Sequence, residues 1–264
     1  MSASRKPKPQ PRPTPKSTDA GHRAAPVRRA KGADQDVEAT PPRKIRADGL
    51  TYSRAAAIKH LRATSPEMDA LIGAAGKFDV RPEQDLYPYP YLLRSIVYQQ
   101  LNGTAAATIL GRVLDLFGGE VPPPEQLLEA DVDALRGAGL SGAKTAAILD
   151  LARHAANGDL PTHDEVPSLS DLELVDRLTV VRGIGPWTVH MLLMFRLGRP
   201  DVLPTGDFGV REGWRMLHGL ERQPTPTEFR AATEAWRPYR SVGSWYMWRA
   251  VDLHRDGRAI VLPT

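Results

Sequence analysis

An acid and a glycine-rich turn upstream of it are the residues of this chain best suited to chemistry. The turn is Gly183-Ile184-Gly185, between two apolar segments of helical spacing, and Asp207 follows Trp187 by twenty residues. Glycine accepts positive φ and lets another backbone come close. A helix that starts at Pro186 or Trp187 would point N–H groups at whatever approaches the turn, which suits a phosphate. A phosphate-binding turn beside a single acidic residue indicates chemistry on a nucleic acid.

Asp207 has two interpretations, and they are compatible. Asp is a favoured N-cap, and Phe208 can start a helix directly after it; for an isolated Asp this is the commoner role. A helix N-terminus also keeps a carboxylate ionised at neutral pH. An ionised acid is suited to an oxocarbenium-like transition state, in which positive charge develops on a sugar.

Aromatic and amide side chains elsewhere could complete such a site. Trp187 taken alone would be a core aromatic. Trp245, Tyr246 and Trp248 lie on one late helix and cannot all turn inward, so at least one is expected to face a cleft, where it could stack on an extruded, positively charged base. The stretch Gln99–Asn102 ends one helix and enters a turn. It could fill the gap left by a flipped base, or be a polar cap with a core leucine.

The composition excludes several classes of protein. The chain has 264 residues and no cysteine, which rules out disulfides, iron–sulfur clusters and thiolate zinc sites. The seven histidines show no metal-binding spacing, so no metal site is expected. No signal peptide and no run of 18 apolar residues is found. We therefore expect a protein without membrane contact, cytoplasmic and associated with the nucleoid in a bacterium.

Positive charge is concentrated at the start of the chain. Residues 1–46 hold 12 of the 35 Lys/Arg and 4 of the 31 Asp/Glu, a net charge of +8, which leaves 23 basic and 27 acidic residues in 47–264, a net charge of −4. This segment contains eight prolines and almost no large apolar residue. It therefore cannot bury enough apolar surface to offset the entropy that the chain would lose on ordering. We expect residues 1–48 to be a disordered basic tail. It is either an arm that holds DNA electrostatically or an extension without function.

From Tyr52 onward almost every segment has helical spacing, and strand-like alternation is scarce. Ser65-Pro66 predicts a capped helix start, and Ser170-Asp-Leu-Glu173 is a capping box. A second tight turn, Ala138–Ser141, precedes Lys144 and is best interpreted as an ordinary interhelix turn with a surface lysine. The expected helices are 54–64, 66–76, 89–101, 103–117, 124–128, 131–138, 142–157, a helix from 171 into the hairpin, 187–197, 207–218, 227–236 and 241–255. The sequence predicts an all-α protein.

Five segments between residues 95 and 248 resemble, in order and spacing, the helix-hairpin-helix DNA glycosylases, and within them the 3-methyladenine DNA glycosylase II branch. They are Ser95–Leu101, Gly139–Lys144, Asp171–Phe195, Leu203–Val210, and Trp236–Ser241 with Trp248. The resemblance implies a two-lobed helical HhH-GPD domain around a central cleft in residues 49–264. Larger members carry an additional N-terminal β-rich domain, which residues before about 48 cannot form, so this chain resembles a compact subgroup.

The resemblance implies roles for four residues around the reacting base. Asp207 falls on the catalytic aspartate of the family, and Trp187 and Trp248 match pocket aromatics. Met191 stands where some members have an aromatic pocket residue, so the range of lesions does not transfer directly. Bifunctional members carry a lysine at the position of Trp187. The resemblance therefore implies that the lyase step is missing.

The DNA contacts are assigned in the same way. Gly183 and Gly185 match the hairpin amides that hold a DNA phosphate, Leu101 matches the residue inserted into the duplex, and Gln100 and Thr188 are added as neighbouring contacts. Hairpins of this family can hold a monovalent cation through backbone carbonyls; no other cofactor is implied. The expected partner is double-stranded DNA with alkylated bases, bound by a monomer.

The sequence thus predicts a monofunctional DNA glycosylase of base excision repair that removes alkylated purines of the 3-methyladenine and 7-methylguanine type. Two alternatives stay open. A non-catalytic binder of damaged DNA would need Gly183 and Gly185 but not Asp207. A bifunctional glycosylase/lyase would need a nucleophile in place of Trp187.

Overall fold

The computed structural model describes residues 45–82, 86–258 and 260, and within them it contains helices and no strands. The expected all-α fold is confirmed. No described helix combines the length and the apolar character needed to span a bilayer. The α-helices are α1 (Arg54–Arg62), α2 (Pro66–Ala75), α3 (Pro88–Tyr98), α4 (Gly103–Asp115), α5 (Pro124–Leu128), α6 (Val132–Gly137), α7 (Gly142–Ala156), α8 (Asp171–Leu178), α9 (Pro186–Met191), α10 (Phe208–Leu217), α11 (Pro226–Ala232) and α12 (Arg240–Arg255).

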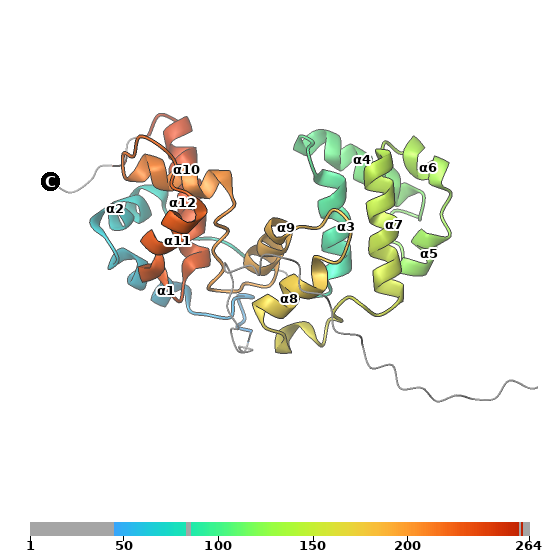
Figure 1. Ribbon diagram of the computed structural model, residues 1–264, viewed down its shortest axis with the longest axis horizontal. Coiled ribbons are helices and arrows are strands. Elements are labelled where there is room, and N and C mark those ends of the chain that lie inside the picture. Colours follow the sequence, from blue (N-terminus) through green and yellow to red (C-terminus); the bar gives the residue numbers. More distant parts are fainter. Residues whose placement is uncertain (1–44, 83–85, 259, 261–264) are drawn as a thin grey trace, which may run out of the picture.

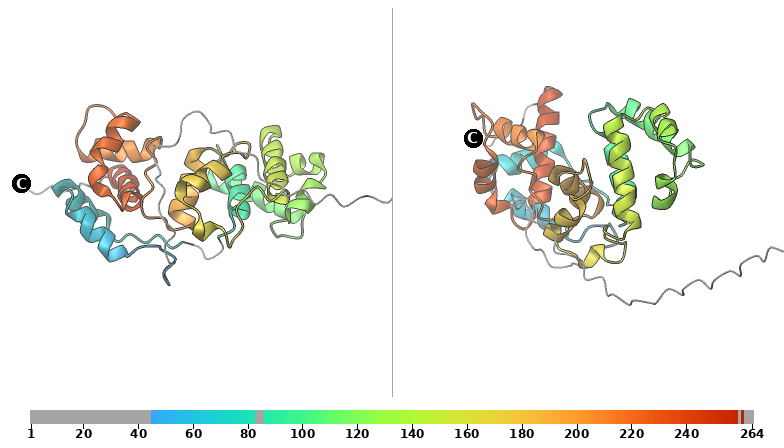
Figure 2. Two further views of the ribbon diagram at one scale, coloured as in Figure 1. Left: turned by 60° about the horizontal axis from the view of Figure 1, so that its bottom comes forward. Right: turned by 45° about the vertical axis from the view of Figure 1, so that its right-hand side comes forward.

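The helices form two lobes, each with its own apolar core (Figures 1 and 2). The first core joins α3 to α9, and the second joins α1, α2, α10, α11 and α12. In both figures α8 and α9 lie between the helices of the second lobe and α3 to α7. Trp248 on α12 packs against both cores. The boundary between the lobes is therefore built from α9 on one side and from α10 and α12 on the other.

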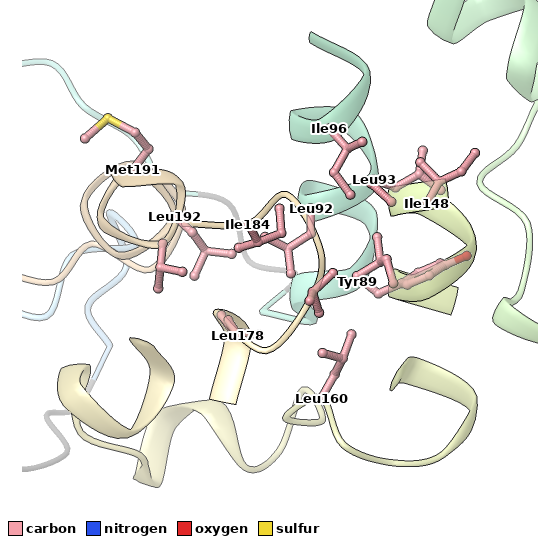
Figure 3. Close-up of a cluster of buried hydrophobic side chains, with 14 of the residues drawn as sticks. Tyr89, Leu92, Leu93, Ile96, Ile148, Leu160, Leu178, Ile184, Met191 and Leu192 are labelled. Atoms are coloured by element: carbon pink, nitrogen blue, oxygen red, sulfur yellow. The ribbon is translucent and has the colours of Figure 1, made fainter. Parts of the chain in front are cut away.

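Buried leucines and isoleucines fix the position of the glycine-rich turn in the first core. Figure 3 shows Ile184 of the turn and Leu192, which follows α9, directed toward Leu92 of α3. These three side chains are 4% exposed or less. Complete burial of a side chain of this size contributes about 1.5–3 kcal/mol relative to exposure. The turn is thus anchored from below by its own central residue.

Side-chain caps set many of the helix starts. Ser65 and Ser170 cap α2 and α8, and Ser170 forms the predicted capping box with Glu173. A second box, Thr225 with Glu228, opens α11 and was not predicted. Each cap satisfies backbone N–H groups that the first helical turn leaves without partners.

Three expectations need correction. The helix predicted over 89–101 ends at Tyr98, because Gln99 is extended (ψ 132°) and Gln100 has a φ of +57°. The helix predicted over 187–197 is α9 followed by a π-helical turn, Leu192–Arg196. Lys144 is half-buried rather than a surface lysine, and its ammonium group donates to the carbonyl of Val97.

The predicted tail lies outside the described residues up to position 44. From Arg46 the chain forms a turn, in which the N–H of Gly49 donates to the carbonyl of Arg46. The described part of the molecule therefore starts just before the predicted domain boundary.

Candidate active site

Asp207 is the N-cap of α10 and lies at the boundary between the two lobes. Its Oδ1 accepts from the backbone N–H of Val210 at 2.8 Å and from Nε1 of Trp248 at 3.0 Å. Its Oδ2 accepts from Nε1 of Trp187 at 2.6 Å. The side chain is 9% exposed. The predicted cap is confirmed, and it leaves one carboxylate oxygen directed at an aromatic side chain from the opposite lobe.

The two indoles reach this carboxylate from different elements. Trp187 stands in the first turn of α9 and is 53% exposed, so it is not the core aromatic that its isolated position suggested. Trp248 lies on α12, is half-buried and packs at 5.7 Å between ring centroids against Phe195 of the π-helical turn. Trp245 and Tyr246 pack against each other instead. Of the three late aromatics, it is Trp248 that faces the site.

Gly209 makes room for this arrangement and was missed at the sequence level. A Cβ at this position would lie 2.9 Å from Cδ1 and 3.0 Å from Nε1 of Trp248, and 3.3 Å from Oδ1 of Asp207. The absence of a side chain therefore allows the indole to lie against the first turn of α10. Glycine directly after a capped helix start was the available signal.

Phe208 was also not assigned a role. It directly follows the carboxylate and is 69% exposed, although it begins a helix whose other apolar side chains are largely covered. Its ring lies next to the carboxylate in sequence and is open to solvent.

A cavity of about 570 Å³ opens beside Trp187, between α3 and α9. Met191 and Thr188 lie in its wall, with exposures of 8% and 7%, so Thr188 faces this cavity rather than the outer surface. The other lining residues are Tyr91, Arg94, Ser95, Tyr98, Gln99, Gln100 and Gly183. This volume is in the range of pockets that hold a small ring system.

The glycine-rich hairpin, residues 181–187, connects α8 to α9. Gly183 has a φ of +80°, which confirms the conformational reason for glycine there. Gly185 has a φ of −105°, so that reason does not apply to it, and nothing lies within 4 Å of its missing Cβ. It is the N-cap of α9, and no side chain caps this helix. Glycine at 185 thus leaves the N-terminus of α9 open to an approaching group.

The turn at residues 99–101 adjoins this hairpin. Nε2 of Gln99 donates to the carbonyl of Gly183 at 2.8 Å. Gln100 is exposed and Leu101 is 39% exposed, so Leu101 is not the core leucine of the alternative interpretation. Gln100 and Leu101 therefore present free side chains next to the hairpin.

Buried ion pairs hold the strap that leads to Asp207, residues 199–207. Arg199 pairs with Asp171 at 3.3 Å, and Arg240 pairs with Asp201 at 2.7 Å. Burial raises the pKa of Asp171 to about 6, with the nearby Arg199 opposing the rise. Arg240 is fully buried, so removing its partner would leave a costly unpaired charge. The strap is thereby fixed to α8 and α12.

The described residues contain no group of three or more His, Cys, Asp or Glu side chains placed to hold a metal ion. Instead of such side chains, the hairpin offers backbone carbonyl oxygens. Those of Val181 and Gly183 each accept one bond, from the N–H of Ile184 at 3.0 Å and from Gln99. A carbonyl oxygen has a second lone pair.

Comparison with known proteins identifies relatives of this arrangement. Residues 93–238 match the family model described as HhH-GPD superfamily base excision DNA repair protein. DNA-3-methyladenine glycosylase 1 of Schizosaccharomyces pombe is 35% identical over 198 residues, covering 74% of this chain and 86% of that protein. The alkylbase DNA glycosidase-like protein mag2 of the same yeast is 31% identical and is covered to 97% of its length.

Solved structures agree. The S. pombe 3-methyladenine DNA glycosylase in complex with abasic DNA superposes with a TM-score of 0.65 at 35% identity, covering 74% of this chain and 95% of that chain. A DNA-3-methyladenine glycosidase from Bacillus halodurans gives a TM-score of 0.69 at 34% identity, covering 76% and 92%.

Proposed function

This chain belongs to the HhH-GPD superfamily of base excision DNA repair proteins, and from this we propose that it is a DNA glycosylase that excises alkylated purines. It hydrolyses the N-glycosidic bond of a flipped nucleotide and leaves an abasic site in an intact strand. Its partner is DNA. We further propose that it acts as a monomer and that its substrates are of the 3-methyladenine and 7-methylguanine type.

The observation that carries this proposal is the carboxylate of Asp207 held between two indoles. Trp187 and Trp248 donate to different oxygens of Asp207 from opposite lobes. An acid fixed in this way has no freedom to turn away when a sugar approaches, so its charge is preorganised for a developing cation. The indole faces beside it suit a flat, positively charged base.

Binding precedes chemistry. The hairpin with Gly183 and Gly185, and the open N-terminus of α9, would hold the phosphate backbone. Gln100 and Leu101 would enter the base stack as the damaged nucleotide leaves it. Thr188 and Met191 would line the pocket that receives the nucleotide. Each of these groups lies on the side of Asp207 from which Trp187 approaches.

The reaction breaks the bond between C1′ of the sugar and N9 of the purine. The electron pair leaves with the base, and positive charge develops at C1′ and the ring oxygen, where Asp207 stabilises it. Water adds to C1′ and gives up a proton to the carboxylate or to solvent. A purine alkylated at N3 or N7 is already cationic and leaves as a neutral base, so one acid suffices where sugar hydrolases use two.

The hairpin argues against a lyase step. A Schiff-base mechanism needs an amine at the sugar, and position 187 carries an indole instead. We expect borohydride to trap no covalent adduct with lesion-containing DNA. A trapped adduct would show that another nucleophile performs the bifunctional reaction.

A monovalent cation at the hairpin carbonyls remains part of the proposal. The carbonyls of Val181 and Gly183 would hold it with their second lone pairs, and its charge would help to neutralise the DNA phosphate. Exchanging K⁺ for tetramethylammonium at constant ionic strength should then weaken DNA binding, whereas equal affinities would remove the ion from the scheme.

The test is base release from duplexes that each carry one lesion, namely 3-methyladenine, 7-methylguanine, ethenoadenine or hypoxanthine. Asp207→Asn should retain the N-cap, lose the negative charge, and lower single-turnover release by at least about a hundredfold, the usual scale of a lost transition-state contact. DNA affinity should change little. Full release by this variant would show that Asp207 is not catalytic. No release by the wild type from any lesion would favour the non-catalytic binder.

A further inference from the structure

Lys144 links the first turn of α7 to the end of α3. Its Nζ donates to the carbonyl of Val97 at 2.7 Å, and burial lowers the pKa of the ammonium group. The last four carbonyls of a helix have no partner within it, and a cation at this end interacts favourably with the helix dipole. Lys144 thus fixes the point at which α3 ends and the turn at residues 99–101 begins.

The turn itself is not held by its own conformational preferences. Gln100 is the one described non-glycine residue with positive φ, at +57°, a region in which L residues are uncommon. Gln99 anchors the turn from the other side, since its Nε2 bonds the carbonyl of Gly183. The turn is therefore held at one end by Lys144 and at the other end by the hairpin.

The same helix α7 also holds the hairpin. Oδ2 of Asp150 accepts from the backbone N–H of Arg182 at 2.9 Å. Cβ of Ala147 lies 3.6 Å from the position that a Cβ of Gly183 would occupy. One face of α7 thereby contacts the end of α3 and the hairpin, one helical turn apart.

We propose that Lys144 and Gln99 are positioning residues that lock the turn at residues 99–101 to the phosphate-binding hairpin, so that Gln100 and Leu101 resist the closing base stack while a nucleotide is flipped. Inserting side chains into a duplex meets a restoring force from stacking. A turn with a strained residue yields to that force unless both of its ends are fixed. The inference rests on the proposed function, because only a base-flipping enzyme needs this rigidity.

The experiment compares two substrates in single-turnover base release. In one, the lesion that the wild type releases is paired in a duplex; in the other, the same lesion is unpaired in a one-nucleotide bulge, where flipping costs less. Lys144→Met should lower release from the duplex about tenfold, the scale of one charge-assisted hydrogen bond, and leave release from the bulge within about twofold of the wild type. Gln99→Met, which removes the donor at similar size and adds no charge beside the phosphate-binding hairpin, should have the same effect.

Controls separate this role from others. Lys59→Met removes an exposed lysine on α1 and should leave both rates unchanged. If Lys144 instead contacts a DNA phosphate, Lys144→Met will reduce the slope of log Kd against log salt by about one and lower both rates equally, which overturns the proposal. Unchanged rates from the duplex in both variants also overturn it. Should Lys144→Met fold poorly, Gln99→Met, in an exposed turn, decides the question. Absence of release by the wild type from either substrate would instead reject the proposed function.

Discussion

At the scale of single residues, position 209 determines whether Trp248 can reach the carboxylate of Asp207. Gly209→Ala would put a Cβ 2.9 Å from the Trp248 ring, so the indole has to move and its bond to Asp207 is lost. A hydrogen bond to a charged group contributes about 1.5–3 kcal/mol. We expect kcat/KM for base release to fall roughly tenfold to a hundredfold, together with a lower melting temperature, because a gain in helix propensity of at most about 1 kcal/mol does not offset the lost bond.

The matched control is Gly111→Ala in α4, where nothing lies within 4 Å of the new Cβ. It should stabilise its helix and leave the reaction rate as it is. If Gly209→Ala and Gly111→Ala react equally fast, the bond between Trp248 and Asp207 is not needed for catalysis.

Asp171 gives stability a specific dependence on pH. Burial raises its pKa in the folded protein to about 6, well above the ordinary value of an aspartate, despite the nearby Arg199. Because the folded state binds this proton more tightly, the contribution of Asp171 to the free energy of unfolding improves as pH falls from about 6 to about 4 and is lost as pH rises again. Urea unfolding of Asp171→Asn should lack this component. On acidification the wild type should therefore gain free energy of unfolding relative to Asp171→Asn. A difference between the two proteins that does not depend on pH would contradict the assignment.

At the scale of elements, the two glycines of the hairpin are needed for different reasons. Gly183 is needed for its backbone conformation, and Gly185 for the open space beside it. Gly183→Ala places alanine at a φ of +80° and should cost about 1–2 kcal/mol of stability. Gly185→Ala has an ordinary φ and open space, so it should fold normally. Both should weaken DNA binding, Gly183→Ala through displaced amides and Gly185→Ala through a methyl group against the phosphate. Thermal melts together with binding isotherms check this; a Gly185→Ala protein that binds DNA fully would remove the N-terminus of α9 from the interface.

The helices also show which features of the fold could be predicted from the sequence. Ser65 and Ser170 correctly predict two helix starts, because capping is a local interaction between neighbours in sequence. The π-helical turn after α9 was missed, since its spacing is that of an apolar helix and only packing reveals the extra residue. Lys144 was misjudged because its partner, Val97, is 47 residues away. Contacts of this kind exist only once the fold brings α3 and α7 together.

At the scale of the whole molecule, the proposed catalytic arrangement depends on both lobes at once. Asp207 and Trp248 belong to helices of the second core, whereas Trp187 starts a helix of the first. The three meet only if the strap at residues 199–207 holds its place, which its buried pairs with Asp171 and Arg240 ensure. Neither lobe contains a complete site. Separation of the lobes by even one ångström would therefore reduce the rate more than it reduces DNA binding.

The charge distribution of the whole chain yields the last prediction. Residues 1–44 carry 11 Lys/Arg and 4 Asp/Glu, whereas residues 47–264 have a net charge of −4. A basic segment that contacts phosphates releases counterions, and log Kd then changes with log salt by about 0.9 for each phosphate contacted. Deleting residues 1–44 should weaken binding to undamaged duplex at low salt and flatten this slope, while base release from saturated lesion DNA stays constant. Equal slopes for the full chain and the truncated protein would assign no DNA contact to the segment. The phosphate contacts would then all come from the rest of the chain, where the hairpin and the turn at residues 99–101 are the proposed sites.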